Sequence, residues 1–187
     1  MSNRQNFGRF PLLFLLLAVD ISLGDLNNFC DEEISQRLDV KFSGEVLISY
    51  GGALPITLFQ EPGTGKESPL VRYERASGED FYTLLMIDPD APQSPWLHWL
   101  VMNIKGDDLN DFGDLKGDTV TEYAPPTPPA GSGYHRYFFY LYYQPHGAVS
   151  SDLGFAVPSR ARFDVGALLE EYGLECEAIH YFKTRSE

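Results

Sequence analysis

Basic residues are scarce in this chain of 187 residues. The 14 Lys and Arg residues are outnumbered by 27 Asp and Glu residues, so the formal net charge is −13. A surface of this charge repels nucleic acids and anionic membranes at long range, and we therefore expect no nucleic-acid partner. An anion that binds here must be held by local contacts in a pocket, against the field of the whole protein.

Cysteine is also scarce, and only Cys30 and Cys176 are present. In an oxidising compartment such a pair is a candidate disulfide, whereas two unpaired thiols are the alternative. A bond that closes so long a loop stabilises a fold by about 4–5 kcal/mol on a chain-entropy argument.

Hydrophobic runs that are long enough to span a bilayer are absent after residue 24. At the N-terminus, Arg4 and Arg9 precede the uncharged apolar run 10–19, and the small residues Ser22 and Gly24 follow it. This three-part pattern predicts a secretory signal peptide over residues 1–24. A membrane anchor is the alternative, but the run is far shorter than the roughly 20 residues that a bilayer requires. We therefore expect a secreted, extracellular protein with no transmembrane segment after cleavage.

An evident catalytic nucleophile is missing as well. No Gly-x-Ser-x-Gly motif occurs, and both cysteines are interpreted as structural. Asp88, His98 and His135 are possible metal ligands, but their spacing matches no known ligand motif. We therefore predict that the protein is not an enzyme and that it needs neither a metal nor a cofactor.

Aromatic and turn-forming residues are abundant, with 13 Phe, 11 Tyr, 13 Pro and 17 Gly. Aromatic side chains fit a pleated surface, and short apolar runs between Gly and Pro residues predict strands. These runs cover 39–42, 45–50, 56–59, 70–74, 81–87, 96–104 and 134–143. Their spacing favours a mostly β fold, an antiparallel β-sandwich with Greek-key connections.

One helix is predicted late in the chain, over residues 163–172. Asp164 is its expected N-cap, and Gly173 is the residue at which it ends. The segment 106–122 lacks apolar periodicity and is predicted to be an acidic loop.

Polar residues lie at the ends of three apolar strands or within them. Asp88-Pro89-Asp90-Ala91-Pro92 follows one strand and, taken alone, is typical of a turn. His98 lies inside the next strand, where a single histidine is more often a core residue. His135 begins a third strand after a proline-rich stretch, and it shares a strand face with Tyr137. Together, two imidazoles, a carboxylate and a tyrosine hydroxyl offer hydrogen bonds suited to a phosphate.

These three segments resemble the phosphatidylethanolamine-binding protein (PEBP) family, which includes the Raf kinase inhibitor proteins and plant flowering-time regulators. The resemblance rests on residues 88–92, 96–104 and 128–137, and it extends over 36–173. With the predicted signal peptide, it indicates the secreted branch. Residues 25–35 are then an acidic leader, 36–173 a PEBP-like domain and 174–187 a C-terminal tail.

The resemblance implies a PEBP-like antiparallel β-sandwich with a few short helices, one of them near the C-terminus. It also implies a small anion pocket at one edge of the central sheet. Carried over residue by residue, the ligand-binding set is Asp88, His98, Pro128, Pro129, His135 and Tyr137. Arg136 belongs to the family motif too, but it points away from His135 along the strand and is expected to be structural.

Departures from the family pattern predict a more open pocket. The link from Pro92 to Trp96 is short, and Pro125 and Pro126 lack the N–H groups that a Gly-Ser-Gly sequence offers. A last strand is possible at 178–182, but the chain ends before the family's closing helix. Whether Tyr181 helps to close the pocket is left open by the sequence.

The function that this resemblance implies is binding of a phospholipid headgroup or another small phosphate-type ligand, such as phosphoethanolamine, in a regulatory role. A secreted protease inhibitor or signalling regulator is the alternative, and it would act through protein contacts independent of the pocket. The acidic surface suits a basic protein partner. If the histidines bind phosphate as cations, affinity should fall as the pH rises through the imidazole range, whereas neutral donors predict a flat profile.

Overall fold

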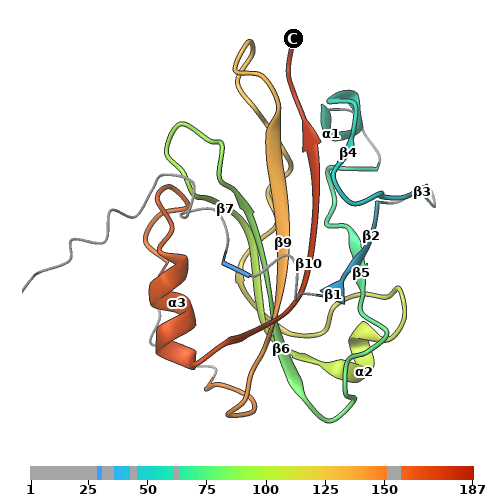
Figure 1. Ribbon diagram of the computed structural model, residues 1–187, viewed down its shortest axis with the longest axis vertical. Helices are drawn as coiled ribbons and strands as arrows, with labels where there is room; N and C mark the ends of the chain where they lie inside the picture. The colour runs from blue at the N-terminus through green and yellow to red at the C-terminus, as the bar shows by residue number, and fades with distance from the viewer. Residues whose placement is uncertain (1–28, 31–35, 43–45, 61–63, 151–156) are drawn as a thin grey trace, which may run out of the picture.

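The computed structural model describes residues 29–30, 36–42, 46–60, 64–150 and 157–187. The predicted signal peptide (1–24) and most of the predicted acidic leader (25–35) lie outside these ranges. Within them the chain forms one sheet of seven strands, one sheet of three strands and a few short helices (Figure 1). The predicted mostly β fold is thereby confirmed.

The larger sheet has the strand order β1-β10-β9-β6-β7-β8, and β4 also pairs with β10. Its strands are β1 (Gln36–Arg37), β4 (Gly52–Ala53), β6 (Phe81–Asp88), β7 (Trp96–Lys105), β8 (Asp118–Thr121), β9 (His135–Tyr143) and β10 (Glu175–Thr184). The smaller sheet has the order β3-β2-β5, with β2 (Asp39–Phe42), β3 (Val46–Leu47) and β5 (Leu70–Arg72). The pairings are antiparallel, except that β1 and β4 run parallel to β10.

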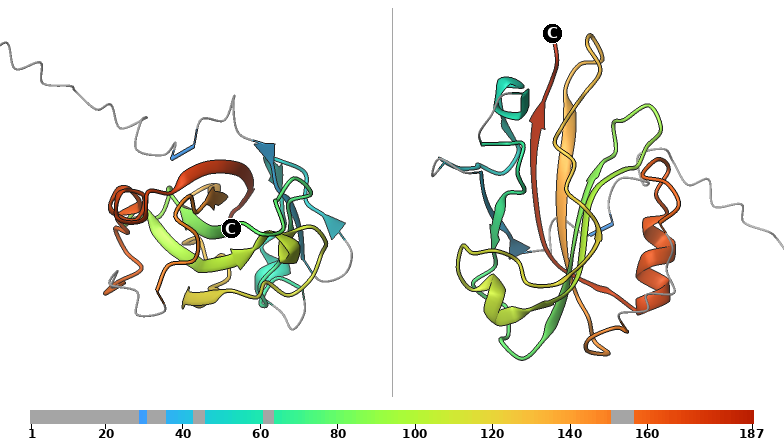
Figure 2. Two further views of the ribbon diagram at one scale, coloured as in Figure 1. Left: turned by 90° about the horizontal axis from the view of Figure 1, so that it is seen from below. Right: turned by 180° about the vertical axis from the view of Figure 1, so that it is seen from behind.

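Both faces of the larger sheet are covered. The smaller sheet lies on one side of it and α3 (Val165–Tyr172) on the other (Figure 2). Alternate residues of β9 therefore enter two different cores: Tyr137, Phe139 and Leu141 face the smaller sheet, whereas Phe138, Tyr140 and Tyr142 belong to the core with α3. Burial on both faces explains why β6, β7 and β9 are nearly continuous apolar runs in the sequence.

The predicted late helix is confirmed, together with its caps. The Asp164 carboxylate accepts a hydrogen bond from the Ala167 N–H at 2.9 Å, and Gly173 ends the helix with a left-handed φ of 60°. Among the described residues, no helix combines the length and the hydrophobicity that crossing a membrane requires.

The candidate disulfide between Cys30 and Cys176 is present. The two Cα atoms are 5.5 Å apart, within the range that a disulfide spans. Cys30 is buried, and the neighbouring Phe29 packs edge-on against Tyr140 at 6.1 Å. The bond therefore ties the start of the described chain to β10, over the core that contains α3.

Several predicted elements were wrong in type. The run 56–59, predicted as a strand, forms the short helix α1 (Thr57–Gln60), because an apolar run of four residues does not distinguish a strand from a helix. The predicted loop 106–122 contains α2 (Gly106–Leu109) and the edge strand β8, whose exposed polar residues hide the strand pattern. Of the strand predicted at 45–50, the described residues form β3, and the Ile48 N–H also donates to the Val40 carbonyl oxygen of β2 at 2.9 Å.

The predicted boundary at residue 173 was too early. The segment 174–187, predicted to be a tail, contains β10, which lies between β9 and the short strands β1 and β4. Ala178, Ile179 and Phe182 of this strand are fully buried, so β10 belongs to the domain core.

Candidate functional site

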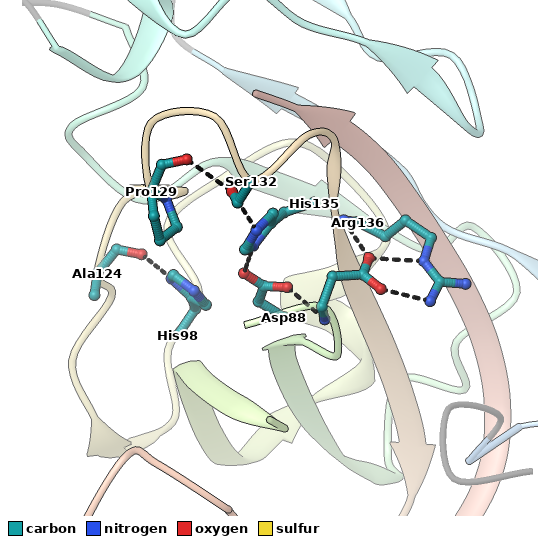
Figure 3. Close-up of polar contacts among 8 residues, drawn as sticks. Asp88, His98, Ala124, Pro129, Ser132, His135 and Arg136 are labelled. Atoms are coloured by element: carbon teal, nitrogen blue, oxygen red, sulfur yellow. Dashed lines mark hydrogen bonds and ion pairs between the residues drawn. The ribbon is translucent and has the colours of Figure 1, made fainter. Parts of the chain in front are cut away.

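The three polar segments meet at one end of the larger sheet, the upper end in Figure 1. Asp88 is the last residue of β6, His98 the third of β7 and His135 the first of β9. Because β6 lies antiparallel between β7 and β9, its end is next to the beginnings of both neighbours. Figure 3 shows the three side chains grouped beneath the loop that carries Pro129.

These side chains surround a cavity of about 180 Å³. It is smaller than the roughly 300 Å³ at which pockets for drug-sized ligands begin, so it suits a headgroup-sized molecule. The residues that line it are Asp88, Ala91, Pro92, Trp96, His98, Thr127, Pro129, His135 and Tyr137.

Five of the six predicted pocket residues line this cavity, and Pro128 does not. In the extended proline stretch, exposure alternates: Thr127 and Pro129 are exposed at the cavity, whereas Pro126 and Pro128 are buried. The motif-based prediction also left out Thr127, which this alternation places at the cavity. Trp96 was also missed, although strand alternation places it on the same face as His98.

Asp88 and His135 form a buried pair, with exposed fractions of 3% and 2%. His135 Nδ1 lies 2.7 Å from Asp88 Oδ2, and Asp88 Oδ1 accepts the backbone N–H of Asp90 at 2.8 Å. Burial raises the pKa of the Asp88 carboxyl, although the hydrogen bond and the charge of His135 oppose that shift. The pair is therefore positioned by β6 and β9 together and is shielded from water.

The proton positions at His135 follow from its second contact. His135 Nε2 lies 2.9 Å from Ser132 Oγ, and the Ser132 hydroxyl donates to the Pro129 carbonyl oxygen at 2.7 Å. A carbonyl only accepts, so Nε2 must carry a proton and donate to Ser132. A further proton is shared by Nδ1 and Asp88, which leaves the pair neutral as a whole. Although the order Asp-His-Ser is that of a hydrolase triad, the Ser132 hydroxyl donates here to the Pro129 carbonyl oxygen and not to His135.

His98 is held as a neutral imidazole. Its Nδ1 lies 2.7 Å from the Ala124 carbonyl oxygen and must donate to it. Burial lowers the pKa of His98 to about 4, and Arg160 and His135 lower it further, against the hydrogen bond to Ala124. Arg160 donates to the carbonyl oxygens of Leu97, His98 and Glu122 at 2.7–3.1 Å. Arg160 therefore fixes the backbone of β7 at Leu97 and His98 and ties it to Glu122.

Tyr137 brings a buried hydroxyl to the cavity wall. The residue is fully buried, its ring meets that of His98 edge-on at 5.2 Å, and its hydroxyl makes no hydrogen bond of good geometry to a described residue, although the Asp88 carboxyl lies near enough to interact with it. Burial and the nearby Asp88 raise the pKa of this tyrosine, so the hydroxyl keeps its proton and is available as a donor.

Arg136 lies outside the cavity, as expected of a structural residue. Its guanidinium makes two hydrogen bonds of 2.8 Å to Asp90, whose carboxylate also accepts the Arg136 backbone N–H at 2.9 Å. Figure 3 places this arginine on the opposite side of Asp88 from His98. The contact ties the segment 88–92 to β9 and so fixes one rim of the cavity.

Tyr181 does not line the cavity. Its ring stacks on Phe138 at 4.8 Å and meets Tyr50 edge-on at 4.7 Å, so it packs into the core on the α3 side. In the part of the chain that the structure describes, no group of three His, Cys, Asp or Glu side chains is arranged to hold a metal ion.

Comparison with known proteins agrees with this arrangement. The sequence profile of the phosphatidylethanolamine-binding protein family matches residues 40–181. The chain is 36% identical over 125 residues to the 26 kDa secreted antigen of Toxocara canis, a match that covers 64% of this chain but only 43% of that protein. It is 32% identical over 170 residues to protein YLR179C of Saccharomyces cerevisiae, covering 80% of this chain and 82% of that one.

Solved structures share the fold, and one of them, a phosphatidylethanolamine-binding protein from Plasmodium vivax, has a TM-score of 0.63 and 21% identity over 85% of this chain and 91% of that one. The carboxypeptidase Y inhibitor in complex with its cognate proteinase has a TM-score of 0.66 and 27% identity, over 82% of this chain and 84% of that one. Because the family profile covers most of the sequence and the fold agrees, the chain belongs to the phosphatidylethanolamine-binding protein family.

Proposed function

We propose that this protein is secreted and binds a small phosphate-type anion, such as the phosphoethanolamine headgroup, in a regulatory rather than catalytic role. The observation that carries the proposal is the buried hydroxyl of Tyr137, a residue that lines the small cavity; this hydroxyl makes no hydrogen bond of good geometry to a described residue and interacts only weakly with Asp88. A buried unsatisfied hydroxyl costs about 1–3 kcal/mol, and an anion that accepts its hydrogen bond removes that cost. His98 and the Asp88–His135 pair supply the other polar groups of the same cavity.

The size and charge of the cavity limit the ligand. A volume of about 180 Å³ holds a phosphorylated headgroup but not acyl chains, which must remain outside. The net charge of −13 disfavours anions at long range, so binding depends on contacts inside the cavity.

Phosphoethanolamine should shift the NMR signals of His98, His135 and Tyr137 in a saturable manner. Tyr137→Phe should weaken binding by about 10–100-fold, because a hydrogen bond to a charged group contributes about 1.5–3 kcal/mol. The same change should leave the free energy of unfolding unchanged or raise it by about 1 kcal/mol, because it removes a buried unpaired hydroxyl. Isothermal titration and urea unfolding measure the two effects.

Tyr142→Phe is a matched control for this variant. Tyr142 is also a fully buried residue of β9 whose hydroxyl lacks a partner among the described residues, but it faces the core on the α3 side. Its removal should leave the affinity for phosphoethanolamine unchanged. No response of the wild-type protein at millimolar phosphoethanolamine would rule out the proposed function.

A second function is favoured by one of the comparisons. The solved structure with 27% identity is a carboxypeptidase inhibitor bound to its proteinase, which makes inhibition through protein contact a candidate here. The double variant His98→Ala/His135→Ala separates the two functions in a carboxypeptidase assay. If the wild-type protein inhibits and the double variant inhibits equally well, the inhibitory surface is independent of the pocket.

Secretion is supported by the disulfide and by similarity to a protein named as a secreted antigen. Expression of the full chain in a eukaryotic secretory system, followed by N-terminal sequencing of protein from the medium, tests it. The mature chain should begin after about residue 24, at the end of the predicted signal peptide. Retention of an uncleaved chain in the cells would contradict secretion.

A further inference from the structure

The position of the hydrogen atom on His98 decides what this residue offers a ligand. Nδ1 donates to the Ala124 carbonyl oxygen at 2.7 Å, so the single hydrogen of the neutral imidazole is on Nδ1. Nε2 then carries a lone pair, and no described residue donates a hydrogen bond to it. Because His98 lines the cavity, Nε2 is an acceptor that is available to a ligand.

The charged groups around His98 oppose a second proton on it. Arg160 donates to the carbonyl oxygen of His98 at 2.9 Å, and its positive charge disfavours an imidazolium there. Across the cavity, the Asp88–His135 pair is neutral as a whole by the proton count above. Burial also disfavours the charged imidazolium, since only 4% of His98 is exposed.

The Tyr137 hydroxyl has the opposite character. It keeps its proton, it makes no hydrogen bond of good geometry to a described residue although Asp88 lies near it, and its ring contacts that of His98. The cavity wall therefore presents one acceptor, His98 Nε2, close to one donor, the Tyr137 hydroxyl. The Nε2–H of His135 is already used by Ser132 and adds no further donor in this arrangement.

A ligand that satisfies both groups must contain a donor and an acceptor close together. A singly protonated phosphate has both on one phosphorus atom, because its P–OH donates and its other oxygens accept. A sulfate group at neutral pH has only acceptors, so one of its oxygens would face the lone pair of Nε2. The charge of the ligand also matters, because no Lys or Arg side chain among the described residues lines the cavity to balance a second negative charge.

From this complementarity we infer that the pocket selects singly protonated phosphate monoesters, with His98 accepting the ligand's P–OH and Tyr137 donating to a phosphate oxygen. The inference rests on the proposed anion-binding function and specifies its ligand. It distinguishes a phosphate monoester from the phosphodiester of an intact phospholipid, which has no P–OH.

Three monoanions of similar size test the inference by isothermal titration at pH 6. Methyl phosphate carries a P–OH in its singly protonated form, whereas methyl sulfate and dimethyl phosphate have the same charge and no such proton. Methyl phosphate should bind at least about 10-fold more tightly than either of the others, as expected when a buried acceptor is left unpaired. Equal affinities for all three would overturn the inference while leaving anion binding intact. If none of them binds, the proposed function fails as well.

The pH dependence gives a second measurement. The second pKa of a phosphate monoester is about 6, so the singly protonated fraction falls from about one half at pH 6 to about 1% at pH 8. Affinity for methyl phosphate should therefore fall about 50-fold over this range, whereas that for methyl sulfate should stay constant. An affinity for methyl phosphate that is flat or rises with pH would show that the pocket accepts the dianion.

Two variants and one NMR spectrum test whether His98 gives the pocket its preference for methyl phosphate over methyl sulfate. His98→Gln places an amide that can either donate or accept, so the preference for methyl phosphate over methyl sulfate should fall to below about 3-fold. Tyr137→Phe is the matched control, since it should weaken both ligands and preserve their ratio. In ¹⁵N spectra of the wild-type complex, His98 Nε2 should remain unprotonated. A protonated Nε2 would mean that the histidine, not the ligand, carries the proton, and would overturn the assignment.

Discussion

The free energy of unfolding should fall by about 5 kcal/mol between pH 8 and pH 4.5 because of two buried histidines, His98 and His180. Burial lowers the pKa of each to about 4, against about 6.5 in the unfolded chain. The unfolded state therefore binds more protons than the folded state between these values. The stabilisation is complete above pH 6.5 and is lost as the pH falls towards 4.

His180 is the better residue with which to test this result, since it lies away from the cavity. Its Nδ1 lies 3.1 Å from the Leu38 carbonyl oxygen, its Nε2 has no partner among the described residues, and its ring meets those of Tyr50 and Phe139 edge-on. Asp39 raises its pKa and Arg37 lowers it, but both effects are smaller than that of burial. His180→Leu should therefore reduce the loss by about half.

Over part of this pH range, the Asp88 carboxyl changes the free energy of unfolding in the direction opposite to the two histidines. Burial raises the pKa of its carboxyl, so it contributes stability at low pH that is lost as the pH rises through the folded pKa. Urea unfolding at half-unit pH steps, for the wild-type protein and His180→Leu, measures the net slope. Identical slopes for the two proteins would show that His180 does not titrate as its burial requires.

Removal of the Cys30–Cys176 disulfide should lower the free energy of unfolding by about 2–5 kcal/mol. The two cysteines are 146 residues apart, so the bond restricts nearly the whole unfolded chain, and about 5 kcal/mol is the chain-entropy limit. Loss of the bond also frees Phe29 and Cys30 from the core that contains α3. Urea unfolding of the double variant Cys30→Ser/Cys176→Ser measures the effect.

Reducing agent provides the control for this prediction. It should destabilise the wild-type protein by nearly as much as the double substitution does, and it should have no effect on the double variant. Phosphoethanolamine affinity should change little in the folded variant, because neither cysteine lines the cavity. A change in the free energy of unfolding below about 1 kcal/mol would contradict the assigned contribution of the bond.

Sequence reasoning predicted best those elements that two cores bury. The strands β6, β7 and β9 have apolar side chains on both faces, so their runs are long and unambiguous. The helix α3 has a capping Asp164 and a terminating Gly173. By contrast, β8 is an edge strand of polar residues, and α1 is too short for its period to be recognised.

The sequence motifs indicate which side chains lie together, but not where their protons are. Asp88, His98, His135 and Tyr137, which the motifs single out, line one cavity. Their donor and acceptor roles depend on contacts with the Ala124 and Pro129 carbonyl oxygens, Ser132 and Arg160, which no local pattern indicates. For Pro128, the family motif alone did not show which way each proline of the extended stretch faces.

The most direct test of the account is a crystal structure of the mature protein soaked with phosphoethanolamine. The account predicts a phosphate group inside the cavity, with its oxygen atoms within hydrogen-bond distance of the Tyr137 hydroxyl and of His98 Nε2. The Cys30–Cys176 bond should be visible in the same crystals. A cavity that holds only water at millimolar phosphoethanolamine, with the site open to solvent, would contradict the account.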